Sequence, residues 1–230
     1  MKTIWTTMSL LLSATAITAI PVAGHAADLA AKPVYKAPIA VDVWNPWMIR
    51  LRVLGVIPEN GGSVNQIAGS SLKTSDAVVP ELDITYFFTK NVAAELVLGV
   101  TKHSVSGADA LAGIDVGKAW LLPPTLTLQY HVTEFGAFKP YVGAGVNYTW
   151  FFNQTAAGGT VIESHLKNSF APVVQFGFDY MIDQHWGWNV DVKKVWLRPN
   201  WDGTLAGGVP VTGQVKLDPW LIGTGITYKF

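Results

Sequence analysis

Eight segments of this 230-residue chain alternate large apolar residues with polar or small ones, and this two-residue period is the feature that most restricts its fold. In the closing stretch LIGTGITYKF, one face holds Phe230, Tyr228 and Ile226, and the other holds Lys229 and Thr227. The eight segments are 44–57, 79–89, 91–104, 120–133, 138–151, 169–182, 186–197 and 215–230. The alternation predicts strands with one apolar face, as found in a soluble sandwich or barrel and in a membrane-spanning barrel.

The first 26 residues have the layout of a secretory signal peptide. Lys2 precedes an apolar run from Met8 to Ile20, and Pro21 and small residues then lead to a predicted cleavage after Ala26. A transmembrane anchor is the alternative, but the run is short for a spanning helix of about 20 residues and no basic flank follows it. Residues 27–43 are rich in Pro and Ala and are predicted to form a flexible periplasmic tail.

The composition favours a barrel in a membrane over a soluble domain. Charged residues make up 14% of the chain, against about 25% in ordinary soluble domains, and no later segment has the length and apolarity of a transmembrane helix. In lipid, the other structure that satisfies every backbone group is a closed β-barrel. The sequence has no Cys and equal numbers of basic and acidic residues, so we expect no disulfide, no metal or other cofactor, and no nucleic-acid partner.

The connections between the segments alternate between tight and long. The tight ones are 89–91, 133–137 and 182–185, and the long ones, rich in Gly, Ser, Thr and Asn, are 58–78, 105–119, 152–168 and 198–214. Outer-membrane barrels place short turns in the periplasm and long loops outside. The sequence therefore predicts an all-β protein whose residues 44–230 form an eight-stranded antiparallel transmembrane barrel of the bacterial outer membrane, with both termini in the periplasm.

Charged residues of both signs lie on the faces opposite the apolar rows. We expect the apolar rows to contact outer-membrane lipid and the charges to pair inside the lumen, because an unpaired charge away from water is costly. The predicted lumen charge network contains Arg50, Arg52, Glu81, Asp83, Glu95, Lys139, Asp179, Asp191, Lys193 and Lys229. Aromatic residues near the turns and near the long connections predict two belts at the membrane interfaces.

The last strand ends on Phe230, with Tyr228 two residues before it. This ending resembles the carboxyl-terminal signal of outer-membrane barrels, so we expect the final strand to contact the barrel-assembly machinery. Several stretches also closely resemble the outer-membrane protein W family. They are WMIRLRVLGVIPENGG, PELDITYFFTKNVAAELVLGV, LLPPTLTLQYHV, FKPYVGAGVNYTWFF, APVVQFGFDYMIDQHWGWNVDVKKVWL and LDPWLIGTGITYKF, which together extend from about Trp47 to Phe230. The resemblance implies an eight-stranded outer-membrane barrel associated with passage of small hydrophobic molecules, stress tolerance or bacteriocin reception.

The inward positions near the long connections are more apolar than those below them. They predict an apolar cup made of Leu54, Val56, Leu121, Phe151, Val195 and Leu197. An eight-stranded barrel is only just wide enough for side chains to fill it, so the cup could line a narrow path for small hydrophobic ligands or could be plain core packing. The alternative function is a plugged structural or receptor barrel whose outer loops bind partners without transport. Neither the ligand nor the oligomeric state follows from the sequence.

Catalysis is not expected, because no nucleophile and base converge. Adjacent His103 and Ser104 should point to opposite faces of a strand, and His165 has only Glu163 nearby in a long connection. No His spacing indicates a metal site.

Pro123 and Pro124 lie inside a segment predicted to be a strand paired on both sides. Proline cannot donate a ladder hydrogen bond, and a closed barrel has no edge to accommodate it. Two interpretations remain open. The strand could start at Thr125 with both prolines in the loop, or the prolines could mark a lateral opening through which an apolar ligand leaves the cup for the membrane.

Overall fold

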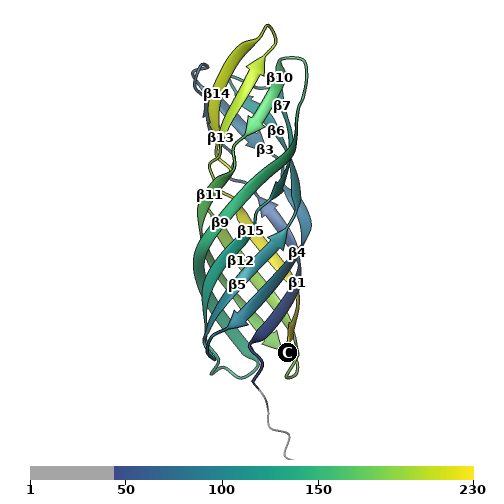
Figure 1. The fold of residues 1–230 in the computed structure, drawn as a ribbon, viewed down its shortest axis with the longest axis vertical. Coiled ribbons are helices and arrows are strands. Elements are labelled where there is room, and N and C mark those ends of the chain that lie inside the picture. Colours follow the sequence, from purple (N-terminus) through teal and green to yellow (C-terminus); the bar gives the residue numbers. More distant parts are fainter. Residues whose placement is uncertain (1–43) are drawn as a thin grey trace, which may run out of the picture. The chain divides into compact units, whose positions relative to one another are not determined.

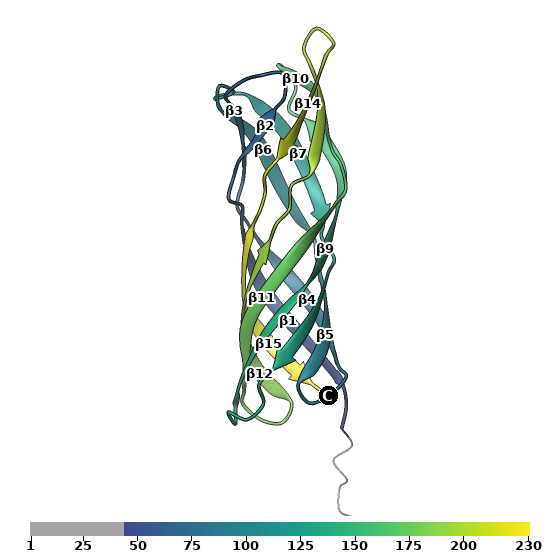
Figure 2. The same cartoon turned by 90° about the vertical axis from the view of Figure 1, so that its left-hand side faces the viewer.

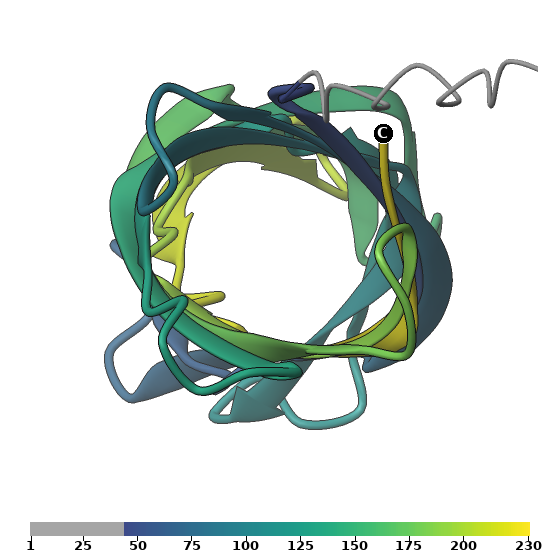
Figure 3. The same cartoon turned by 90° about the horizontal axis from the view of Figure 1, so that it is seen from below.

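The computed structural model describes residues 44–230, in which eight antiparallel strands close into a barrel (Figure 3). The strands, in chain order, are β1 (Trp47–Ile57), β4 (Ala77–Phe87), β5 (Val92–Gly99), β8 (Thr125–His131), β9 (Phe138–Ala156), β11 (Ser169–Met181), β12 (Trp186–Val195) and β15 (Trp220–Lys229). Each pairs with its neighbour in this order, and β1 pairs with β15 to close the ring. The predicted fold class is confirmed. The predicted signal peptide and tail lie outside the described residues.

The two faces of the wall differ in polarity as the alternation predicts. Apolar side chains such as Leu51, Val142 and Phe176 project outward and are more than half exposed, whereas Gln175 and Lys193 project inward and are buried. Closure into a ring pairs every one of the eight strands on both sides, so that no strand is left as an edge. No helix among residues 44–230 is long and apolar enough to cross a membrane.

Aromatic side chains form clusters on the outer face at two levels. At the end near the carboxyl terminus, Trp186 packs against Tyr228 with ring centroids 4.7 Å apart, and Tyr228 packs against Phe230 at 4.9 Å. At the other level, Phe152 lies 6.2 Å from Trp150 and 6.4 Å from Trp120. Tryptophan and tyrosine favour the headgroup boundary, so the lipid-facing band lies between these two levels.

The long connections contain strands of their own, which the sequence analysis did not predict. Their strands form two sheets that extend the wall at the end opposite the carboxyl terminus (Figures 1 and 2). The first sheet joins β3 (Ser70–Thr74), β6 (Thr101–Asp109) and β7 (Asp115–Leu122) to the end of β9, and the second contains β2 (Gly62–Val64), β10 (Val161–Leu166), β13 (Asn200–Leu205) and β14 (Val209–Val215). The physical reason is burial, because Leu72, Val116, Val161, Trp201 and Val215 pack into one apolar core.

Candidate functional site

Arg50 is the centre of one half of a buried ionic cluster in the lower lumen. Its guanidinium binds Asp179 through two contacts, Nε to Oδ1 at 3.0 Å and Nη2 to Oδ2 at 2.6 Å, and Nη1 lies 2.5 Å from Glu95 Oε2. Thr227 also donates to Asp179 Oδ1 at 2.7 Å. A guanidinium suits this role because its planar fork of donors can bind two carboxylates at once.

Arg52 and Lys193 form the other half of the cluster. Arg52 lies 2.9 Å from Glu81 Oε1 and 2.6 Å from Asp83 Oδ2, and the Lys193 ammonium lies 2.5 Å from Asp191 Oδ1. Longer contacts of 3.7 and 3.8 Å join Arg52 and Lys193 to Glu95, which connects the two halves. We call these eight residues, Arg50, Arg52, Glu81, Asp83, Glu95, Asp179, Asp191 and Lys193, the ionic plug.

Neutral side chains complete the ionic plug. Gln175 donates to Glu95 at 2.9 Å and to Asp191 at 2.8 Å, and the Tyr141 hydroxyl donates to Asp191 at 2.7 Å. A Cβ at Gly177 would lie only 2.6 Å from the Tyr141 hydroxyl oxygen, so glycine is needed there for the tyrosine to reach the plug. All eight ionic residues are at most 2% exposed, so the plug is a buried column across the lumen held by hydrogen bonds and ion pairs.

Lys139 and Lys229 differ from the other members of the predicted network. Both line a separate pocket of about 230 Å³ at the turn end of the barrel, together with Phe87 and Asp179. Lys139 donates to the carbonyl of Thr133 at 2.9 Å, and the Lys229 ammonium lies 5.2 Å from the Phe87 ring centroid. The ionic plug as defined here contains three bases and five acids, and Lys139 and Lys229 lie nearer the turn-end mouth, in a pocket that Asp179 of the plug also lines.

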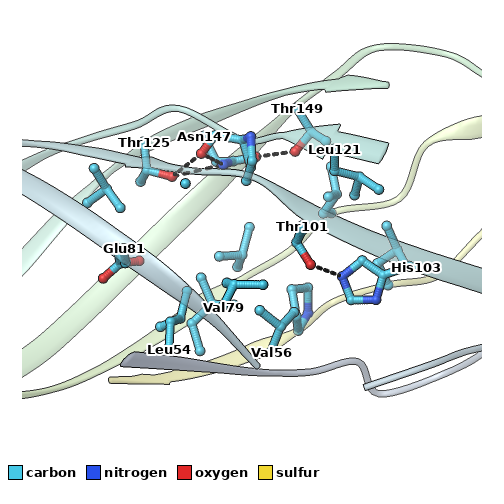
Figure 4. Close-up of a pocket in the computed structure, with 18 of the residues that line it drawn as sticks. Leu54, Val56, Val79, Glu81, Thr101, His103, Leu121, Thr125, Asn147 and Thr149 are labelled. Atoms are coloured by element: carbon cyan, nitrogen blue, oxygen red, sulfur yellow. Dashed lines mark hydrogen bonds between the residues drawn. The ribbon is translucent and has the colours of Figure 1, made fainter. Parts of the chain in front are cut away.

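An apolar cavity of about 70 Å³ lies directly above the ionic plug (Figure 4). Five of the six residues predicted for the apolar cup line it, namely Leu54, Val56, Leu121, Val195 and Leu197. Phe151 is instead buried in the apolar core above it. Glu81, a member of the plug, also lines the cavity, so the apolar chamber borders the charged column without a layer between them.

Polar residues on the cavity wall, which the sequence did not single out, bind one another. The Asn147 amide donates to Thr125 Oγ1 at 2.8 Å and to the Pro123 carbonyl at 3.0 Å, and Thr149 donates to Asn147 Oδ1 at 2.7 Å (Figure 4). Their odd numbers place them on the inward face of β8 and β9, which is the signal that could have found them. Because their donors are already occupied, the surface they offer a ligand is mostly apolar.

The barrel wall has a break in its hydrogen-bond ladder beside this cavity. Across it, Val97 on β5 pairs with Thr125 on β8, and the next registered pair is Thr101 on β6 with Leu121 on β7. Residues 98–100 and 122–124 have no registered partners across this seam, and Val97, Gly99, Val100 and Pro123 all line the cavity.

Pro123 and Pro124 separate two strands of the wall, which agrees with the interpretation that the strand starts at Thr125, while the lateral opening stays a prediction. Strand β8 does start at Thr125, but β7 ends at Leu122 immediately before the prolines. The prolines stay bonded to β9 on their other side, since the backbone amide of Tyr148 donates to the Pro124 carbonyl at 3.0 Å. The break is therefore confined to the seam facing β5 and β6.

The histidines considered for catalysis have other partners. His103 lies 2.6 Å from the carbonyl of Ser75 and 3.1 Å from Thr101 Oγ1, and burial lowers the pKa of this imidazole, while Ser104 points outward and is exposed. His165 contacts Gln154 at 3.4 Å. Within residues 44–230, no group of three or more His, Cys, Asp or Glu residues could hold a metal ion.

Comparison with known proteins agrees with this architecture. The model of the OmpW family matches residues 47–230. The chain belongs to the OmpW family. Among its relatives, the outer-membrane protein y4mB of Sinorhizobium fredii is 52% identical over 89% of each chain, and the dibenzothiophene metabolism operon protein PahQ of Pseudomonas aeruginosa is 28% identical over 84% of this chain and 93% of its own.

A solved structure of another outer-membrane protein shares the fold. The crystal structure of the outer membrane protein OprG from Pseudomonas aeruginosa superposes with a TM-score of 0.73 at 28% identity, covering 80% of this chain and 95% of that one. The predicted resemblance is confirmed, and the chain is an outer-membrane barrel whose apolar face contacts lipid.

Proposed function

We propose that this OmpW-family barrel is an uptake path for small hydrophobic molecules, which enter the apolar cavity from outside and leave sideways through the ladder break. The observation that carries the proposal is the position of the cavity. The cavity borders the ionic plug below. At its side it borders segments 98–100 and 122–124, which have no registered pairs with each other. The name of the relative PahQ, which refers to the metabolism of dibenzothiophene, a small apolar compound, supports this substrate class.

The ionic plug makes an axial route unfavourable for such a ligand. To pass downward, an apolar molecule would have to separate Arg52 from Glu81 and Asp83 without offering any polar group in return. Separating a buried ion pair costs about 3–5 kcal/mol when one partner is lost. A sideways step through the break separates no ladder hydrogen bonds, because none is registered there.

The size of the cavity indicates that the wall widens around a ligand. A dry cavity of about 150 Å³ holds a benzene molecule, roughly twice the volume of about 70 Å³ found here. The two segments at the break can separate from each other without loss of ladder bonds across the seam. In this proposal, the movement of the wall that makes room for the ligand is therefore also the movement that opens the lateral exit.

Matched Val→Thr substitutions test this function. Val56→Thr with Val195→Thr places two hydroxyls in the cavity, whereas Val116→Thr with Val211→Thr places two in the apolar core outside it. Both pairs bury new hydroxyls and should cost similar stability. Uptake of an apolar fluorescent probe into proteoliposome membranes should slow for the cavity pair alone. If both pairs transport at the wild-type rate, the cavity is not on the path.

We also propose that both termini are periplasmic, that the last strand engages the assembly machinery, and that the barrel is not an enzyme. Single Cys substitutions at Asn65, Asp109 and Gly207 should react with an impermeant thiol reagent on intact cells, and those at Asn91 and Asp183 should not. The opposite labelling pattern would reverse the orientation.

A receptor is the second candidate, favoured by the ordered sheets above the barrel. The sheet of β2, β10, β13 and β14 is held by registered pairs and by Trp201, whose indole donates to Ser164 at 2.8 Å. Such a rigid rim could bind a partner without any transport. Uptake of the apolar probe by wild-type proteoliposomes that is no faster than uptake by protein-free liposomes would favour this function.

A further inference from the structure

Three lysines project from the outer face of the extended wall just beyond the aromatic cluster of Trp120, Trp150 and Phe152. Lys102 on β6 pairs with Trp120 on β7, and its ammonium lies 5.4 Å from the indole ring centroid. The next outward pair is Ser104 with Lys118, and Lys73 on β3 pairs with Ser106. All three lysines are exposed.

A hollow of about 620 Å³ lies between these strands. Lys73 and Lys118 line it together with hydroxyl groups, and Asp115 is the acid among its lining residues. We call Lys73, Lys102, Lys118 and this hollow the lysine patch (β3, β6 and β7 in Figure 2). The patch thus presents three cations and several hydroxyl donors to whatever contacts the wall immediately above the lipid-facing aromatics.

The basic residues elsewhere at this level differ, because they are paired within the protein. Lys194, 4.9 Å from the Trp220 ring centroid, binds Glu59 at 2.7 Å, and Lys216 lies 3.4 Å from the same carboxylate. The hydrogen bond from Lys194 holds the pKa of Glu59 below its ordinary value. Arg198 binds Asp218 at 2.7 Å. No ion pair of this kind involves Lys73, Lys102 or Lys118 within residues 44–230.

We infer that the lysine patch binds the phosphate groups of a phosphorylated glycolipid in the outer leaflet, whose acyl chains lie along the aromatic and aliphatic wall below. Two observations support this occupant: the patch complements a phosphate in charge, and it is continuous with the lipid-facing surface. Tryptophan at the headgroup boundary fixes the depth, so a cation one residue pair above Trp120 lies where lipid phosphates begin. The inference rests on the proposed orientation, in which this end faces outside, and not on transport.

Binding of lipid A tests the inference. Purified wild-type protein in nanodiscs would be titrated with lipid A that carries both phosphates and with the dephosphorylated lipid, and retention would be measured by native mass spectrometry. Lys102→Gln with Lys118→Gln removes two patch cations. The matched control, Lys167→Gln with Lys216→Gln, removes two lysines at the same end that are already paired with Asp202 and Glu59.

Each lysine near an anionic surface contributes about a fivefold preference, so the patch variant should bind the phosphorylated lipid roughly 20- to 30-fold more weakly. The control should bind as wild type, and the dephosphorylated lipid should bind equally weakly to all three. Equal binding of phosphorylated lipid by patch variant and control would overturn the inference, as would an equal loss for both lipids. Probe uptake in the same variants should stay at the wild-type rate, which separates this test from that of the transport function.

Discussion

Two levels of the same lumen, the ionic plug and the apolar cavity above it, are built from the same strands but with opposite chemistry. At the plug, β1 pairs continuously with β4 and β15, and Arg50 and Arg52 project inward to buried acids. At the cavity, Leu54 and Val56 occupy the next inward positions of β1, and the wall opposite loses its pairing near Pro123. Buried ion pairs fill the lumen where the wall is fully paired, and the pairing of the wall is interrupted where the lumen is apolar.

The largest effect is expected from a plug substitution. Arg50→Met removes the cation that binds Glu95 and Asp179 and leaves both carboxylates buried. The free energy of unfolding should fall by about 3–5 kcal/mol, the cost of breaking a buried pair from one side. Urea titration in bilayers would measure it. Lys139→Met at the turn-end pocket is the control and should cost about 1 kcal/mol or less, the value of one hydrogen bond. Equal costs would mean that the lower lumen is hydrated and is not a dry plug.

The next effect tests which face of the wall meets lipid. Phe176 lies near the middle of β11 and is 54% exposed on the outer face, whereas Gln175 is 3% exposed inside, between Glu95 and Asp191. Phe176→Lys should cost about 2–4 kcal/mol, as a lysine does at the bilayer midplane. Gln175→Lys should cost much less, because the new ammonium meets two acids. The same denaturant titration compares them, and the reverse order would exchange the lipid and lumen faces.

The comparison between plug and cavity also separates what the sequence could predict from what it could not. The alternation of side chains along each strand identifies inward and outward residues, so Arg50, Asp179 and Leu54 are all assigned to the lumen without a structure. This alternation does not fix the position of a residue along the barrel axis, which depends on the register between strands. For this reason the sequence assigns Lys139 and Lys229 to the lumen but does not place them at the turn-end pocket that they line.

Composition was misleading for the long connections. Their Gly, Ser and Thr residues are typical of loops, yet sparse apolar residues such as Leu72, Val161 and Val211 are enough to build strands once they share a core. Strand formation there depends on contacts between segments far apart in the chain, which a local pattern does not contain. Similarly, Pro123 and Pro124 indicated missing ladder bonds, but only the register shows that the gap faces Gly99 and Val100 beside the cavity.

The smallest effect on stability, and the sharpest test of the upper level, is expected from Pro123→Val with Pro124→Val. Valine favours an extended strand and restores two backbone donors, of which the one at 123 faces β5 and β6 while the one at 124 faces Tyr148 on β9, so the seam could close. Each added hydrogen bond would stabilise the barrel by about 0.5–1.5 kcal/mol, so the unfolding free energy should be unchanged or slightly higher. Uptake of an apolar probe into proteoliposome membranes should become slower, because the wall can no longer widen without breaking ladder bonds.

A control variant and a second measurement make this outcome interpretable. Pro172→Val, in β11 opposite Val146, changes a proline of the wall that does not line the cavity, and it should leave uptake unchanged. Hydrogen exchange then reports whether the amides at 123 and 99, which the register places opposite each other across the seam, are protected, which shows that the seam has closed. Slower uptake together with protected amides places the exit at this seam. Protected amides with wild-type uptake would exclude it, and the apolar cavity would then need another outlet, since the ionic plug still blocks the way below.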